Sequence, residues 1–235
     1  MNYKLVKKSL ICGLILALLI VLYYLQHGKD LNYPYNEFTD MLGHASYTFY
    51  DNLLFQYFFI PVYIVFLLVQ KEANPQYVIR RKSKEIKVLL DYVDLGYNTI
   101  LFTLILSIPF LLIPCMYYFS NQLEEFIQLG MIQLFLYSLI FYIVGLLFQW
   151  LDSYLHKSWI SGSIIIGIFY VYSFFNEKRF IIYVFEYNNL IPYHYTTNEI
   201  LTSVSPKSLV VLYVGLISVI GISRLLKCEK EEYFK

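Results

Sequence analysis

The ionisable side chains of this sequence are concentrated in residues 74–94, NPQYVIRRKSKEIKVLLDYVD. Within that stretch, six of eight consecutive residues are charged, five of them basic: Arg80, Arg81, Lys82, Lys84, Glu85 and Lys87. Such side chains form ion pairs and charge-assisted hydrogen bonds. Their chemistry is therefore recognition, either of anionic lipid headgroups or of a protein partner that carries complementary charge.

Side chains suited to catalysis occur without the partners that catalysis requires. Glu124 and Glu125 are similar to the paired glutamates of CAAX-type intramembrane proteases, but no arginine follows in the next apolar run, and the four histidines lie outside the apolar runs. The pair is interpreted as an acidic turn. No GxxxxGK[ST] loop is present for a nucleotide, and the three cysteines are far apart. We therefore expect no catalytic residue, no metal site and no cofactor in this chain.

The elements around the basic stretch are apolar. Hydrophobic residues make up 58% of the 235 residues and charged residues 15%, against about 45–50% and about 25% in a soluble domain. Six runs are long enough, or nearly so, to cross a bilayer as helices: 9–25, 53–70, 97–119, 131–150, 159–175 and 208–223. The sequence predicts one all-α transmembrane domain over residues 1–235. It also predicts a retained first helix rather than a cleaved signal.

The distribution of Lys and Arg orients these six spans. With both termini inside, the inner segments hold 14 basic residues and the outer ones 4, so both termini are expected to be cytoplasmic. Arg224, at the end of the sixth run, is expected to extend toward the membrane surface. Net charge is +1 and gives no indication of nucleic-acid binding. Composition rich in Tyr, Ile, Asn and Lys suits an AT-rich bacterial genome, so a multi-pass protein of the bacterial plasma membrane is expected.

With this orientation, the basic stretch becomes a cytoplasmic connector between spans two and three. Ile79, Ile86 and Leu89 recur at helical spacing, and charged residues form another stripe. We expect an amphipathic helix over about 76–91 that leads into span three. Binding to anionic headgroups explains its bases. Interleaved acids at Glu85, Asp91 and Asp94 favour docking to a cytoplasmic protein.

The segment IRRKSKEIKVLLDYVDLGYNTILF resembles the connector in permease subunits of type-2 ABC transporters, which are mainly exporters. The half-apolar outer segment 176–208 and the tail RLLKCEKEEYFK are similar to the same family. The resemblance implies that the connector is a coupling helix seated in a separate ATPase, which binds ATP and Mg²⁺. It also implies a dimer with an identical or similar permease, and a partly re-entrant 176–208. The amino-terminal MNYKLVKK is too short for the family's full elbow helix.

Within the spans, polar but uncharged residues are the candidates for lining a translocation path: Gln56, Asn98, Thr103, Ser107 and Gln133. Taken singly, each also suits hydrogen bonding between helices. No charged group lies in mid-span, so an exporter of this kind is expected to move an amphipathic or lipid-like cargo such as a peptide or antimicrobial. Prolines 61, 109 and 114 are expected to kink spans two and three.

A different interpretation of the same layout is a membrane protein that is not coupled to an ATPase. Six short spans in a small chain also suit the substrate-binding component of a vitamin-uptake system, or an immunity or accessory factor that works by contact. An ATPase partner would distinguish the exporter from both.

Overall fold

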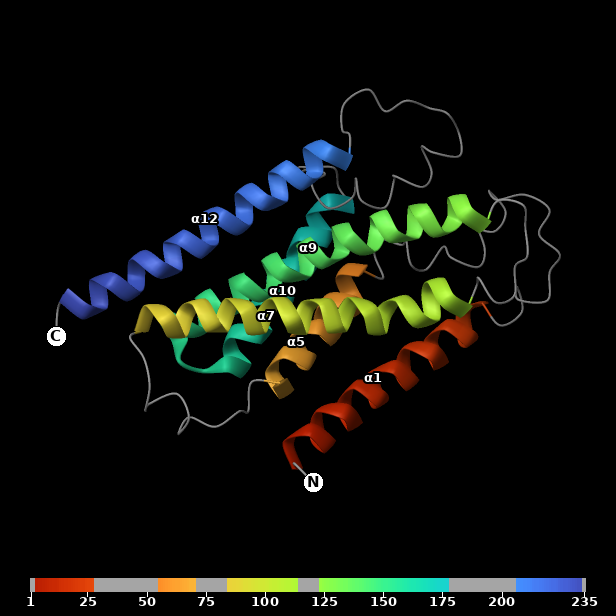
Figure 1. Cartoon of the computed structure of the whole chain (residues 1–235), viewed down its shortest axis with the longest axis horizontal. Helices are drawn as coiled ribbons and strands as arrows, with labels where there is room; N and C mark the ends of the chain where they lie inside the picture. The colour runs from red at the N-terminus through yellow and green to blue at the C-terminus, as the bar shows by residue number, and fades with distance from the viewer. Residues whose placement is uncertain (1–2, 28–54, 71–83, 114–122, 178–205, 234–235) are drawn as a thin grey trace.

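The computed structural model describes residues 3–27, 55–70, 84–113, 123–177 and 206–233, and all regular structure in this part of the chain is helical (Figure 1). Two π-helical segments, η2 (Phe55–Phe59) and η3 (Ile108–Leu112), adjoin α-helices. The α-helices are α1 (Tyr3–His27), α5 (Ile60–Gln70), α7 (Lys84–Ser107), α9 (Leu123–Leu155), α10 (Ser158–Glu177) and α12 (Pro206–Tyr233). The predicted all-α class is confirmed for the described residues.

The described part of each predicted span falls on one helix or on a helix with its π-helical extension. Two segments, Val88–Leu112 and Leu134–Leu155, are long and apolar enough to cross a membrane by length and composition. The apolar parts of the other four helices are shorter, at 10–17 residues. The connector expected over 76–91 is described from Lys84 onward, where it forms the first two turns of α7.

One feature of the outer segments differs from the sequence-based expectation. Glu124 and Glu125 belong to the first turn of α9 instead of a turn between helices. Acidic residues are favourable at this position because the helix dipole is positive at the amino-terminal end. The apolar pattern underestimated the length of α9. A helix extends beyond its apolar segment wherever the flanking residues have high helix propensity.

Helix α9 is the centre of the packing and contacts α5, α7, α10 and α12. Aromatic rings fill much of this interior: Phe55 stacks on Tyr137 with ring centroids 4.5 Å apart, and Tyr63 lies 4.9 Å from Phe141. Gly145 of α9 allows the close approach, since a Cβ added there would lie only 2.5 Å from a Leu95 methyl carbon. Small residues commonly mark such close helix contacts in membrane proteins.

Prolines coincide with both π-helical segments. Pro61 follows η2 and has no N–H to donate to the carbonyl of Tyr57, four residues earlier. The hydroxyl of Tyr170, on α10, donates to that carbonyl at 3.2 Å. Pro109 lies within η3. The sequence predicted kinks in spans two and three. The structure shows a π-helical segment in each of them, and the kinks themselves stay a prediction. Pro114 lies outside the described residues.

Helices α9 and α10 are joined by a tight turn at His156 and Lys157. His156 adopts a left-handed backbone with φ of 53°, and its N–H donates to the carbonyl of Asp152 at 2.9 Å. This is the usual way a helix ends, although glycine normally occupies the position. The short turn makes α9 and α10 antiparallel neighbours.

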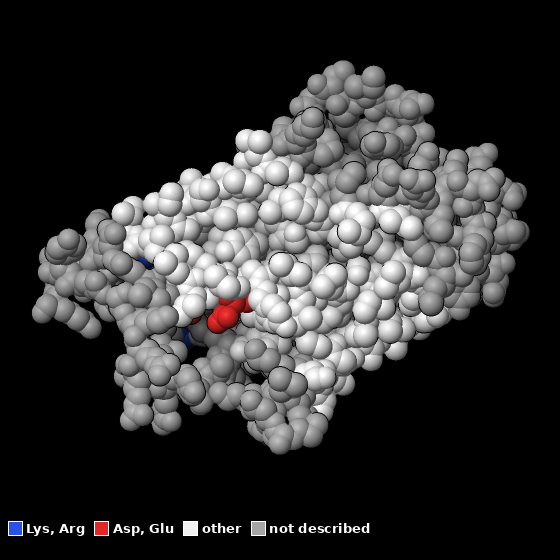
Figure 2. Space-filling view, in the orientation of Figure 1, with Lys and Arg blue, Asp and Glu red and all other residues white. Residues whose placement is uncertain are grey.

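The outer faces of the bundle are apolar. On α1, Leu10, Leu14, Leu18, Val21 and Leu25 are exposed along one face, and α12 likewise exposes Val211, Val214, Val219, Ile222 and Leu226. The described surface in Figure 2 is almost entirely uncharged, apart from one acidic patch and traces of basic side chains. Contiguous apolar surface of this extent is unusual for a soluble monomer and suits contact with lipid.

Candidate functional site

The basic connector is only partly described. Arg80, Arg81 and Lys82 lie outside the described residues. Lys84, Glu85 and Lys87 lie in the first turns of α7, and the description of these three covers the backbone only. Helix α7 runs without interruption from Lys84 to Ser107. The end of the connector and span three are therefore one helix, while the ion-pairing role of the six residues stays a prediction.

Helix α7 is tied to α12 by an ion pair. An Nη of Arg224 lies 2.9 Å from a carboxylate oxygen of Asp91, and the side chains are 11% and 35% exposed respectively. Arg224 was expected to extend toward the membrane surface, and that expectation stays a prediction. The structure shows that its guanidinium donates to the side chains of Asp91 and Gln149.

Gln149 connects the same ion pair to α9. Its side-chain oxygen accepts a hydrogen bond from Arg224, and its Nε2 donates to the backbone carbonyl of Asp91 at 3.3 Å. Both ends of the Gln149 amide are therefore used. One donor and one acceptor on a single side chain join α9 to α12 and to α7.

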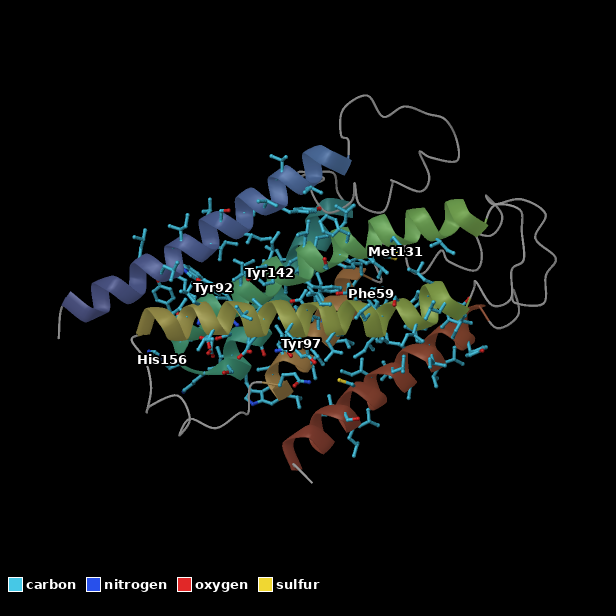
Figure 3. All side chains as sticks on the ribbon, viewed as in Figure 1. Phe59, Tyr92, Tyr97, Met131, Tyr142 and His156 are labelled. Atoms are coloured by element: carbon cyan, nitrogen blue, oxygen red, sulfur yellow. The ribbon has the colours of Figure 1, made fainter. Side chains whose placement is uncertain are left out.

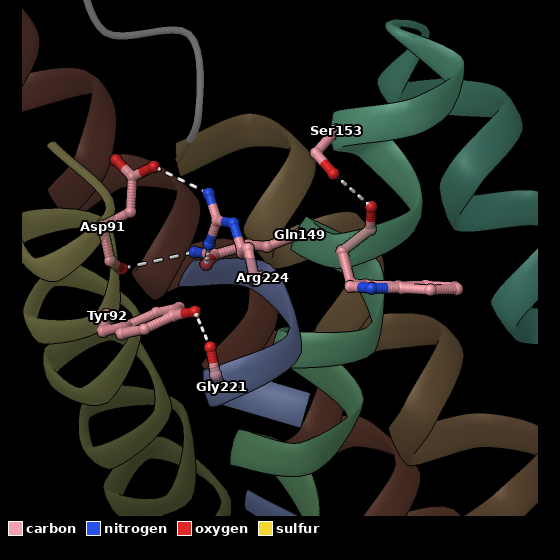
Figure 4. Close-up of polar contacts among 7 residues, drawn as sticks. Asp91, Tyr92, Gln149, Ser153, Gly221 and Arg224 are labelled. Carbon is pink, nitrogen blue, oxygen red and sulfur yellow. Dashed lines mark hydrogen bonds and ion pairs between the residues drawn. The ribbon is translucent and has the colours of Figure 1, made fainter. Parts of the chain in front are cut away.

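Two tyrosines, Tyr92 and Tyr142, complete the arrangement, and Figure 4 draws the first of them. The hydroxyl of Tyr92 donates to the backbone carbonyl of Gly221 at 2.9 Å, and its ring lies 5.3 Å from the Arg224 guanidinium carbon. The hydroxyl of Tyr142 donates to the carbonyl of Tyr92 at 3.3 Å. We call this group the polar clamp: Asp91, Tyr92, Tyr142, Gln149, Gly221 and Arg224.

The position of the polar clamp follows from helix direction. Asp91 and Tyr92 lie near the start of α7, whereas Gln149 and Arg224 lie toward the ends of α9 and α12. Helices α9 and α12 thus run antiparallel to α7. Tyr92 and His156 lie toward one end of the bundle, and Met131 lies toward the other (Figure 3). The clamp therefore belongs to the end of the bundle from which the connector emerges.

Three of the five predicted path-lining residues have described side chains: Asn98, Thr103 and Ser107. Thr103 is buried and donates to the Thr99 carbonyl at 2.5 Å, and Ser107 donates to the Leu104 carbonyl at 2.7 Å. Both bonds stay within α7. Asn98 is half-buried on the same helix, while Gln56 and Gln133 lie on η2 and α9, where their side chains are outside the description. Their role in transport stays a prediction.

A second interhelical contact lies deeper in the bundle. The Thr99 hydroxyl donates its only proton to the Leu95 carbonyl at 2.8 Å. The hydroxyl of Tyr63, 2.7 Å from Thr99, must therefore be the donor between them. This bond joins α5 to α7. It is a structural contact, since a buried hydroxyl requires a partner.

The polar clamp was not predicted from the sequence. Asp91 was interpreted as one of the acids interleaved with the connector bases, and Arg224 as a base at the end of a span. The available signal was that Asp91, Gln149 and Arg224 all lie at the cytoplasmic edge of predicted spans, where opposite charges gain from pairing. What the clamp offers chemically is rigidity, because every group in it is held by another.

The comparisons with known proteins add nothing to these contacts. A scan against protein-family models, a search of curated proteins and a search of solved structures each gave no match. The function must therefore be inferred from the residues and their arrangement.

Proposed function

We propose that this chain is the membrane-spanning permease subunit of an ABC-type exporter, with six transmembrane helices and both termini in the cytoplasm. A separate ATPase docks on the connector at about residues 76–91 and drives the movement of an amphipathic or lipid-like cargo. The observation that carries the proposal is the continuity of α7. A single helix of 24 residues leads from the charged connector into the apolar bundle.

Two further observations support the proposal. The polar clamp brings the start of α7 to the ends of α9 and α12, as a chain that crosses the membrane in alternating directions requires. Lys157, in the turn between α9 and α10, then lies at the same end as the connector, and the positive-inside count favours that end as cytoplasmic. The apolar exposed faces of α1 and α12 suit a lipid environment.

The proposal also assigns roles to residues. Arg80, Arg81, Lys82, Lys84 and Lys87 pair with carboxylates of the ATPase, and Glu85 pairs with a base there and sets the orientation. Energy from ATP binding then reaches the membrane because α7 has no break before Ser107. A secondary transporter is less favoured, because the spans lack the mid-membrane charge that ion coupling normally uses.

The test is co-purification from the source membrane. The tagged chain is expected to bring down an ATPase, and the triple charge reversal Arg80→Glu, Arg81→Glu and Lys84→Glu is expected to abolish that capture. The matched control reverses three other cytoplasmic charges, Lys4, Lys7 and Lys8, and is expected to leave capture intact. Cysteine accessibility on each side of the membrane checks that topology is unchanged.

Other outcomes would overturn the proposal. A chain that purifies without any ATPase and binds a small molecule would support the uptake-component alternative. A connector that lies outside the cell, or that binds only anionic vesicles, would contradict the docking role. Equal loss of capture in the control would show that general charge, and not the connector, determines the association.

A further inference from the structure

We infer that the polar clamp makes the cytoplasmic ends of α7 and α12 one rigid body, so that a displacement of the connector at Lys84 moves the end of α12 with it. The inference deepens the proposed function and rests on it for the source of the displacement. It assigns Asp91, Gln149 and Arg224 as positioning residues, because none of them needs to touch cargo or ATPase.

The first step is the distance between connector and clamp. Asp91 lies seven residues beyond Lys84 in an uninterrupted helix, which at 1.5 Å per residue is about 10 Å along the axis. The first irregular segment after Lys84 is η3, which begins at Ile108. A force applied at Lys84 therefore reaches Asp91 before it meets any π turn.

The second step is that the clamp holds backbone as well as side chains. Gln149 donates to the carbonyl of Asp91, and Tyr92 donates to the carbonyl of Gly221. The first bond joins α9 to α7 and the second joins α7 to α12, and the Arg224–Asp91 pair adds a charged contact between α7 and α12. The ion pair and the Tyr92 bond together resist sliding and rotation of α7 against α12 more than either contact would alone. The residues come from three helices, as Figure 4 shows.

The third step is that the charge pair is protected. The Arg224 side chain is 11% exposed, and the Tyr92 ring covers the guanidinium at 5.3 Å from its centroid. Salt screens such a pair much less than it screens a fully exposed pair. Opening the clamp would leave the guanidinium and the Gln149 amide without partners, which costs free energy. A displacement of α7 is therefore expected to move α12 with it and not to break the contacts between the two helices.

Asp94 is the matched control. It lies three residues beyond Asp91 on the same helix, is exposed, and forms no ion pair with any residue in the described ranges. Asp91→Asn and Asp94→Asn change the charge identically, on neighbouring turns of one helix. Only the first removes the negative charge from a contact to α12, where the asparagine oxygen can accept only a weaker hydrogen bond from Arg224.

The experiment measures distances between spin labels in the full chain in lipid nanodiscs. Cys12, Cys115 and Cys228 are first replaced by serine, and labels are placed at Leu90 on α7 and Leu226 on α12, both exposed. The unmodified clamp is expected to give one narrow distance peak. Asp91→Asn is expected to lose that peak and Asp94→Asn to keep it. The reversed pair Asp91→Arg with Arg224→Asp is expected to restore it.

A second arm follows the motion itself. With the captured ATPase present, ATP and orthovanadate are expected to shift the distances from a label at Leu10 on α1 to Leu90 and to Leu226 together. In Asp91→Asn only the distance to Leu90 should shift. If that variant does not fold, Tyr92→Phe, which removes only the hydroxyl bond to Gly221, is expected to broaden the α7–α12 distance peak.

The inference is overturned if Asp91→Asn keeps the narrow peak, if Asp94→Asn loses it equally, or if Leu226 still moves with Leu90 after the clamp is cut. These results differ from failure of the proposed function, which would appear as no captured ATPase. The first arm needs no ATPase, so it tests whether α7 and α12 form one rigid body whether or not an ATPase is captured.

Discussion

Replacing Arg224 by methionine is expected to destabilise the bundle by about 2–4.5 kcal/mol. The change removes a charge-assisted hydrogen bond to Asp91, which is worth about 1.5–3 kcal/mol, and a bond to Gln149, which is worth about 0.5–1.5 kcal/mol. Breaking a fully buried pair costs about 3–5 kcal/mol. The lower estimate applies here because Asp91 is 35% exposed and water can reach it.

The measurement is a double-mutant cycle. The free energy of unfolding of each protein is obtained by denaturant titration in mixed micelles. The four proteins carry the native pair, Arg224→Met, Asp91→Leu and both changes together. The double variant is expected to be more stable than the sum of the single losses, with a coupling energy of about 0.5–3 kcal/mol. An apolar pair leaves no uncompensated charge, although Gln149 still loses its donor.

Asp94→Leu is the control for this cycle, since it removes a carboxylate on the same helix without removing a described ion pair. It is expected to add to Arg224→Met without coupling. The reasoning would be refuted if the single variants at Asp91 and Arg224 lose no more unfolding free energy than the Asp94 control and show no coupling energy. That result would show that the clamp contacts do not stabilise the bundle.

Three other predictions concern packing and backbone, each measured as a change in unfolding free energy. Gly145→Ala is expected to destabilise by about 1–3 kcal/mol because its Cβ would overlap side chains from two neighbouring helices, whereas Gly167→Ala, in open space, should not destabilise. His156→Gly is expected to stabilise by about 1 kcal/mol because it relieves a left-handed backbone at φ 53°, and a loss would contradict this. Tyr170→Phe is expected to lower the free energy of unfolding by about 1 kcal/mol, because it removes the hydroxyl that donates to the Tyr57 carbonyl. In a Pro61→Ala background the loss is expected to be smaller, since the new backbone N–H can donate to the same carbonyl. An equal loss in both backgrounds would be evidence against this role of the hydroxyl.

The helices were predictable because each depends on residues close in sequence. An apolar run near twenty residues long has few alternatives to a helix, and all six runs are helical where described. The ends were less predictable: α9 begins at Leu123, eight residues before the run beginning at Met131. Apolar content reports where a helix can meet lipid, whereas helix length depends on caps and propensity.

The polar clamp was not predictable from sequence because its parts are distant. Asp91 and Arg224 are separated by 133 residues, and their pairing depends on the relative rotation of three helices. Arg224 alone indicates only a base at the end of a span. The residues that the sequence did single out for ion pairing, from Arg80 to Lys87, are still predictions, because their side chains lie outside the described part of the chain.

The clamp also changes the interpretation of the connector. Sequence alone counted Asp91 among acids interleaved with the bases, but Asp91 is occupied by Arg224. The segment 80–87 then carries five positive charges and one negative, 5 − 1 = +4, without compensation from Asp91. The ATPase proposed to dock on this segment is therefore expected to present a cleft rich in carboxylates.

A net charge of +4 on the connector distinguishes docking on a protein from binding to lipid better than the interleaving of acids and bases did. Anionic headgroups satisfy a +4 segment in any orientation, whereas a protein cleft satisfies it only in one, with Glu85 opposite a base. Reversing Glu85 to lysine should therefore weaken capture of an ATPase while strengthening binding to anionic vesicles. If lipid is the connector's only partner, this substitution strengthens vesicle binding and has no effect on ATPase capture. The proposed ATPase would then have no docking site on α7.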